Sequence, residues 1–277
     1  WGLNRWYNQL LACLLAIALL GFLFFFSNNL STVIVLFCIC AVILLSSVKK
    51  PDLYWYFLLG LALIIIAAIF VTVYLLMHQG AENFRFVRIR AWLHPEEYAA
   101  DEGLQAMQAR YAIGAGGFWG KGLGQSLIKF KLSYSYNDFI LAIICEELGV
   151  FGVIVMMTLF GYLLYRIYKI AQNAWDIEGK VLAIGVFTQI ALQLLINVMV
   201  VTSVIPTTGV TLPFFSAGGT SVVFLLAELG MVLNVDKYAK ERRFFEEAER
   251  YVAQMEQRGG IGAAGWRRRL DSARTRR

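Results

Sequence analysis

The stretch RYAIGAGGFWGKGLGQSLIKFKLSYSYNDFILAIICEELG, residues 110–149, joins a glycine-rich basic segment to a long apolar run through Asn137 and Asp138. The first half contains six glycines and three lysines: Gly114, Gly116, Gly117, Gly120, Gly122, Gly124, Lys121, Lys129 and Lys131. Glycine allows backbone to approach a ligand closely, and lysine suits a phosphate group. The apolar run carries Glu146 and Glu147 in its interior. We therefore expect a ligand-binding junction at a lipid–water boundary.

The composition around this stretch is that of an integral membrane protein. Of the 277 residues 59% are hydrophobic and 16% are charged, whereas soluble domains are roughly 45–50% apolar. The net charge of +6 lies mostly in short connections and the tail, where cytoplasmic basic bias places it, so nucleic acid is not an expected partner. The four cysteines lie in apolar runs and are interpreted as small hydrophobic residues rather than disulfides.

Six apolar runs are long enough to cross a bilayer, which takes about 20 helical residues. They are residues 8–26, 30–48, 53–77, 139–165, 181–205 and 213–235. The predicted fold is an all-α integral membrane protein, a polytopic helical bundle with a large extracytoplasmic loop and a re-entrant outer segment.

Basic residues set the predicted orientation. They precede the first span, follow the second and fourth, and begin the tail, so the positive-inside rule places both termini of this chain in the cytoplasm. The predicted organisation is three spans in 1–77, a large extracytoplasmic loop in 78–137, three spans in 138–236 with an outer segment at 204–221, and a charged cytoplasmic tail in 237–277.

Two features of the ends stay open. The chain begins at Trp1, which is compatible with a cleaved signal peptide and with a fragment that lacks earlier spans. Residues 237–256 are rich in helix formers with opposite charges and predict a surface helix. The arginine-rich residues 266–277 either bind the anionic inner leaflet or form a solvated, disordered end.

Asp138 stands where the fourth span begins. An Asn-Asp pair before an apolar run is a good helix N-cap, and this structural interpretation is the more frequent one. A carboxylate at a helix N-terminus near several cations would stay ionised at neutral pH, which favours a general base or a metal ligand. Glu146 and Glu147 lie about 12–14 Å further along the helix, and we interpret one as the partner of a cation or backbone amide within the bundle.

Polar residues also recur in the last two spans. Gln189, Gln193 and Asn197 share one helix face of the fifth span and could line a polar interior. Glu228 is a further acid, in the sixth span.

Residues 204–221 contain two of the chain's four prolines. Irregular backbone at membrane depth is stable where protein or a water-filled cavity satisfies its hydrogen bonds, so a re-entrant segment is favoured over a plain loop.

These motifs, in order and spacing, resemble the SEDS proteins (shape, elongation, division and sporulation), the RodA/FtsW/SpoVE group of bacterial cell-wall polymerases. The resemblance covers about 110 residues through AIGAGGFWGKGLGQS at 112–126, NDFILAIICEELGVFG at 137–152 and QLLINVMVVTSVIPTTGVTLPFFSAGGTS at 193–221. It implies a ten-span glycosyltransferase of the bacterial cytoplasmic membrane that polymerises lipid II at the outer face. A class B penicillin-binding protein, a transpeptidase, is the implied protein partner, beside membrane lipids.

The resemblance also implies roles for individual residues. Asp138 occupies the position of the family's catalytic aspartate and would take the proton from the attacking sugar hydroxyl. Loop cations, or a divalent cation such as Mg²⁺ or Mn²⁺, would offset the charge of the departing pyrophosphate. The expected substrate-binding residues are Arg88, Lys121, Gln125, Lys129, Gln193, Asn197, Thr208 and Ser216.

Some positions depart from the family pattern. Six spans are predicted where the family has ten, KLSYSYND before the aspartate is one residue short and lacks a Pro-Glu pair, and Ala217 replaces a tyrosine. Two alternatives therefore remain beside the enzyme: a transporter that flips lipid II, and a non-catalytic scaffold of the wall-synthesis machinery.

Overall fold

The computed structural model describes residues 30–47, 84–94, 97, 102–127, 138–216, 218–257 and 263–275. Within these ranges every regular element is an α-helix. The predicted spans 8–26 and 53–77, and Lys129, lie outside the described residues.

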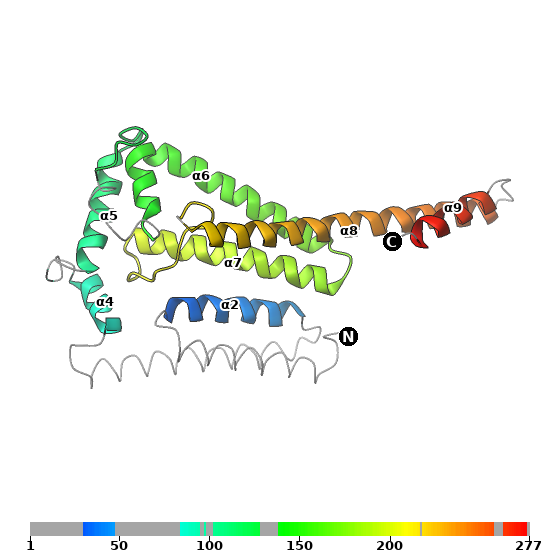
Figure 1. Ribbon diagram of the computed structural model, residues 1–277, viewed down its shortest axis with the longest axis horizontal. Coiled ribbons are helices and arrows are strands. Elements are labelled where there is room, and N and C mark those ends of the chain that lie inside the picture. Colours follow the sequence, from blue (N-terminus) through cyan, green and yellow to red (C-terminus); the bar gives the residue numbers. More distant parts are fainter. Residues whose placement is uncertain are drawn as a thin grey trace.

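Among the described residues, the bundle consists of α2 (Leu30–Ser47), α6 (Ile140–Asn173), α7 (Ile177–Val201) and α8 (Gly219–Gln257). Helix α7 is central, with α2 along one side and α6 and α8 along others (Figure 1). Three of these, α6, α7 and α8, are long and apolar enough to cross a membrane. The prediction of an all-α membrane protein is confirmed, because uninterrupted apolar runs of this length satisfy their backbone polar groups as helices.

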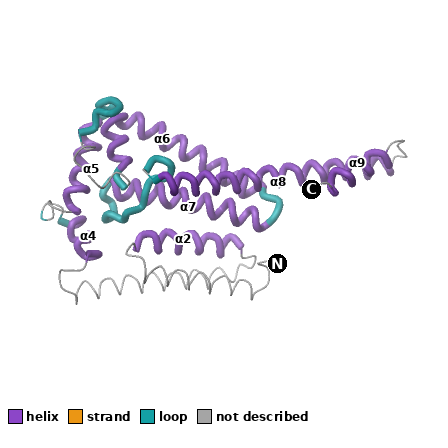
Figure 2. Tube along the Cα trace, in the orientation of Figure 1, coloured by secondary structure: helices purple, strands orange, loops and turns teal. Residues whose placement is uncertain are grey.

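Two further helices, α4 (Phe84–Leu93) and α5 (Glu102–Gly116), lie within the region predicted only as a loop. They stand across the end of the bundle where α6 begins and α7 ends (Figures 1 and 2). Helix α5 packs against α6 and contributes the fully buried Ala109 and Ala112 to the core. The small side chains of these alanines allow the two helices to approach closely.

Helix α6 is broken at Gly149, whose φ of 66° and ψ of −168° are not helical. The turns before Gly149 run beside α5, and the rest of α6 runs away across the bundle (Figure 1). This backbone region is essentially restricted to glycine. The span predicted at 139–165 is therefore helical on both sides of a break that its apolar pattern did not indicate.

The connection from α7 to α8 contains no helix among its described residues and packs against the protein. Leu212 and Ser216, both buried, lie on it, and the Leu212 backbone N–H donates to the Ser216 hydroxyl over 2.8 Å. Packed irregular backbone is what the two prolines of residues 204–221 led us to expect.

No break in the helix separates the predicted sixth span from the predicted tail. Helix α8 runs without a break from Gly219 to Gln257 and leaves the bundle as a long rod (Figure 1). No proline interrupts this stretch, and Lys240 pairs with Asp236 one turn earlier at 2.6 Å, so the helix continues into the charged region. A further helix, α9 (Ala263–Thr275), packs on α8 and contradicts disorder of the tail over those residues.

Candidate functional site

The glycine-rich segment after α5 closes over the break in α6. Because Gly149 is not helical, the backbone groups on either side of it need partners outside the helix. Four backbone hydrogen bonds supply them: Lys121 N–H to the Glu146 carbonyl (2.9 Å), Gly122 N–H to the Glu147 carbonyl (2.9 Å), Val150 N–H to the Gly117 carbonyl (3.0 Å) and Phe151 N–H to the Phe118 carbonyl (3.1 Å). We call this arrangement the clip.

The clip explains why glycines occupy this segment. A Cβ atom at Gly116 would overlap the Cys145 carbonyl, and one at Gly120 would overlap the Glu147 carbonyl. Gly120 also has a φ of +76°, which L side chains rarely adopt. Close approach is therefore needed, as predicted, but the approach is to α6 rather than to a ligand.

Glu146 lies beneath the clip with only 1% of its side chain exposed. Its Oε1 accepts from Lys121 Nζ at 2.7 Å and from the Leu127 N–H at 3.4 Å, and its Oε2 accepts from Ser126 Oγ at 2.6 Å. A cation and a backbone amide are the partners that we expected for one of the two glutamates. Lys121 gives Glu146 one of the three donors of its ammonium group, and its role as a phosphate ligand stays a prediction.

Asp138 lies just before α6, at the end of the bundle that α4 and α5 cross. The N-cap position of α6 is occupied by Phe139, and no side chain caps the helix; the capping role predicted for Asp138 is therefore wrong. Burial raises the pKa of the half-buried Asp138 carboxyl above its ordinary value, and the Arg88 guanidinium opposes that rise. The sequence had suggested that nearby cations would keep the Asp138 carboxylate ionised. In the structure, loss of hydration has the larger effect on its pKa.

Asn197 holds the backbone of Asp138 in place. Its side chain is fully buried, and its Nδ2 donates to the Asp138 carbonyl at 2.9 Å and to the Val210 carbonyl at 3.0 Å. One amide on α7 thus joins the start of α6 to the α7–α8 connection. Asn197 thus positions the start of α6 through its Nδ2, while the substrate contact that the sequence suggested for it stays a prediction.

The other predicted site residues are spread over the structure. Gln193 is half-buried on α7, one turn from Gln189, whose amide contacts the Glu228 carboxylate on α8 at 3.1 and 3.2 Å. Gln125 is exposed beside the clip, and Glu147 is half-buried in α6. The buried Oγ1 of Thr208 has no hydrogen-bond partner.

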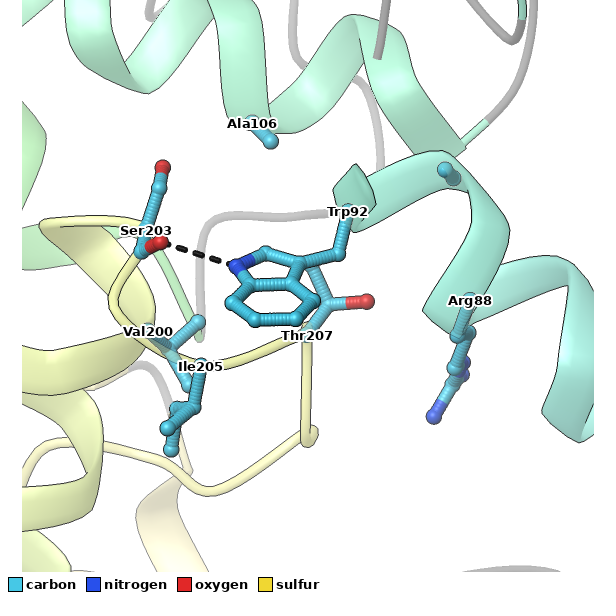
Figure 3. A pocket seen from close by; sticks show the side chains of 8 residues that line it. Arg88, Trp92, Ala106, Val200, Ser203, Ile205 and Thr207 are labelled. Carbon is cyan, nitrogen blue, oxygen red and sulfur yellow. Dashed lines mark hydrogen bonds between the residues drawn. The ribbon is translucent and has the colours of Figure 1, made fainter. Parts of the chain in front are cut away.

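A narrow cavity separates α4 and α5 from the α7–α8 connection (Figure 3). Arg88, Trp92 and Ser203 line it, and Trp92 Nε1 donates to the Ser203 carbonyl at 2.8 Å while Arg110 Nε donates to Ser203 Oγ at 2.9 Å. Its volume of about 10 Å³ admits about one water molecule, so it is not a substrate-sized pocket. The contacts of Trp92 and Arg110 were not foreseen, because their partner lies about a hundred residues away in the chain.

The described residues do not fit a resident divalent cation. No group of three His, Cys, Asp or Glu side chains gathers among them. Mg²⁺ accepts one or two carboxylates, but it then depends on substrate phosphates and water for the remaining ligands. We therefore derive no step through a metal.

The chemistry of the site follows from these positions. Asp138 is a carboxylate held by its backbone, partly removed from water and within the field of a guanidinium. A raised pKa brings a carboxylate closer to the operating pH and makes it a stronger general base. The arrangement suits removal of a proton from a hydroxyl group.

Comparison with known proteins agrees with this description. A protein-family model described as "Cell cycle protein" and covering FtsW, RodA and SpoVE matches residues 3–241. The chain is 45% identical over 158 residues to Stage V sporulation protein E of Bacillus subtilis, covering 57% of this chain and 43% of that protein. It is 43% identical over 164 residues to a probable peptidoglycan glycosyltransferase FtsW of Trichlorobacter lovleyi, covering 59% and 42%. The chain thus spans less than half the length of these relatives.

Solved structures share the fold. One, described as "Structural coordination of polymerization and crosslinking by a peptidoglycan synthase complex", superposes with a TM-score of 0.64 at 24% identity and covers 86% of this chain and 64% of that chain. RodA of Thermus thermophilus superposes with a TM-score of 0.53 at 23% identity, covering 85% and 58%. With a family match over most of its length and a shared fold, this chain belongs to the FtsW/RodA/SpoVE family of cell cycle proteins.

Proposed function

We propose that this protein is a peptidoglycan glycosyltransferase that polymerises lipid II into glycan strands at the outer face of the cytoplasmic membrane, in cell division, elongation or sporulation. Family membership and the FtsW relatives named as probable peptidoglycan glycosyltransferases support this activity. The proposal concerns the complete protein, because the chain covers less than half of those relatives.

The observation that carries the proposal is the way Asp138 is held. Its carbonyl is fixed by Asn197, and its carboxyl is half-buried with a raised pKa, partly offset by Arg88. In the proposed reaction Asp138 accepts the proton of the sugar 4-hydroxyl of one lipid II as the oxygen attacks the anomeric carbon of the growing strand. The bond from that carbon to undecaprenyl pyrophosphate breaks, and the pyrophosphate leaves with the bonding electrons.

Arg88 is better placed than Lys121 to act on the leaving group. Its charge already acts on Asp138, and its side chain lines the cavity at the same end of the bundle (Figure 3). Lys121, by contrast, is engaged with the buried Glu146. A cation near the developing pyrophosphate charge stabilises the transition state.

The partner and the orientation belong to the same proposal. A class B penicillin-binding protein would cross-link the new strands, in line with the superposition on a chain of a peptidoglycan synthase complex. Both termini of this chain would lie in the cytoplasm, so that Asp138, α4, α5 and residues 204–221 face outward.

Polymer formation by the complete protein, with purified lipid II and its transpeptidase, tests the proposal. Asp138→Ala should abolish glycan polymer while lipid II still binds. The matched control is Asp176→Ala, since Asp176 also precedes a long helix but is exposed and forms no side-chain cap; it should leave polymer unchanged. Polymer at the wild-type level from Asp138→Ala would refute the enzyme, and wild-type protein that moves lipid II across vesicles without polymer would favour the transporter.

A further inference from the structure

A cluster of exposed apolar side chains covers the outside of the clip. Trp119 and Leu123 are 74% and 76% exposed, and neighbouring apolar side chains are at least half exposed: Phe118, Leu127, Val150 and Phe151. The Trp119 ring lies 5.1 Å from that of Phe118 and 5.6 Å from that of Phe151. We call these six residues the aromatic corner.

The aromatic corner is a built surface rather than a loose loop. One backbone hydrogen bond of the clip joins Phe151 to Phe118 directly, and another joins Val150 to Gly117. The buried Glu146 holds the following residues through Lys121 and Ser126. Contiguous exposed apolar surface in a fixed conformation is uncommon unless it contacts a partner.

The position of the corner identifies that partner. Helix α6, which is apolar and long enough to span a membrane, continues the exposed apolar surface beyond Phe151 with Ile154, Val155 and Leu159. The corner thus lies at the break in α6, beside the end of α5, and the apolar stripe on α6 begins there (Figure 1). Tryptophan at the end of a membrane span is typical of the headgroup boundary, where amphipathic rings are most stable.

We propose that the aromatic corner inserts into the headgroup boundary of the bilayer and anchors the protein at the level of Asp138. Eight residues of helix separate Asp138 from Glu146, which corresponds to about 12 Å. This part of α6 runs beside α5 across the end of the bundle (Figure 1), and the clip binds the corner to it. The depth of the corner in the bilayer therefore also fixes the level of Asp138. This inference does not depend on the reaction that Asp138 performs.

Spin-label depth measurements on the complete protein in lipid nanodiscs test this anchor. A nitroxide at Leu123→Cys, in a background without the native cysteines, is compared with labels at Ile154→Cys on the exposed face of α6 and at Arg268→Cys on the exposed surface of α9. The ratio of collisions with oxygen to collisions with a water-soluble nickel chelate should be high at 154, low at 268 and intermediate at 123. A ratio at 123 equal to that at 268, or loss of both kinds of collision through cover by protein, would overturn the proposal.

A second measurement keeps the native cysteines. Lipids brominated near the headgroup should quench wild-type tryptophan fluorescence by a larger fraction than that of Trp119→Phe, since the variant lacks the indole at the boundary. Equal fractional quenching of the two proteins would also overturn the proposal.

Discussion

Replacing Gly149 with alanine should destabilise the protein strongly, because two independent costs act at this position. The backbone region of Gly149, with φ of 66° and ψ of −168°, costs a non-glycine residue about 1–3 kcal/mol. The new Cβ would also overlap Gly120 N and the Phe118 carbonyl, so the clip must withdraw. Losing two of its hydrogen bonds adds about 1 kcal/mol each, which gives a total of about 4 kcal/mol.

The matched control lies on the same helix. Gly161 is exposed and has nothing within 4 Å of an added Cβ, so Gly161→Ala should stabilise the helix by about 0.5–1 kcal/mol. With a melting-temperature change of about 2 °C per kcal/mol for a protein of this size, Gly149→Ala should melt about 8 °C lower and Gly161→Ala about 1–2 °C higher. Circular dichroism in detergent measures both. Equal melting temperatures for the two variants would refute the clip as a structural element.

Four further predictions concern Asp138, Glu146 and the residues around them. Lys121→Met should lower the free energy of unfolding by about 3–5 kcal/mol, since it leaves the Glu146 carboxylate buried without its cation. Adding Glu146→Gln should recover part of this loss in a double-mutant cycle, and additive losses would contradict the pairing. Asn197→Ala should cost about 1–3 kcal/mol by leaving two partly buried carbonyls without their donor. It should also lower kcat more than it raises KM; a change in KM alone would indicate a substrate ligand instead. Burial raises the pKa of Asp138, and Arg88 lowers it. Arg88→Ala should therefore move the acid limb of the pH–rate profile to higher pH, and a shift to lower pH would refute the assignment of that limb to Asp138. A carboxyl group whose pKa is raised by folding contributes stability below its unfolded-state pKa, and this contribution is lost as the pH rises through its folded-state pKa. Asp138→Asn should therefore melt at a higher temperature than the wild type at about pH 7 but not at about pH 3.

The membrane helices could be predicted because bilayer length and apolar content leave few alternatives. The run at 181–205 was recovered as Ile177–Val201 and the run at 30–48 as Leu30–Ser47. The break at Gly149 could not be predicted, since a helix usually tolerates a single glycine in an apolar run at a cost of about 1 kcal/mol. Only the bonds to a segment about 30 residues earlier make the broken form stable.

The candidate site residues could be named from the sequence, but their arrangement could not. Asp138 and Asn197 were both singled out, yet the contact between them joins residues 59 positions apart and no local pattern encodes it. For the same reason the glycines at 116 and 120 suggested a ligand, whereas the atoms that they approach belong to α6. The charged stretch after Asp236 was separated from the sixth span by composition, but helix propensity on both sides makes one continuous helix.

The most direct test of the account is the steady-state kinetics of Asp138→Asn in the complete protein with lipid II. Asparagine keeps the size of the side chain and the backbone contact with Asn197 but cannot accept the proton. We predict that kcat falls by about 10²–10⁴-fold, as expected for loss of a general base, while KM for lipid II changes by less than about twofold. A kcat equal to that of the wild type, or a loss that lies entirely in KM, would contradict the assignment of Asp138 as the base.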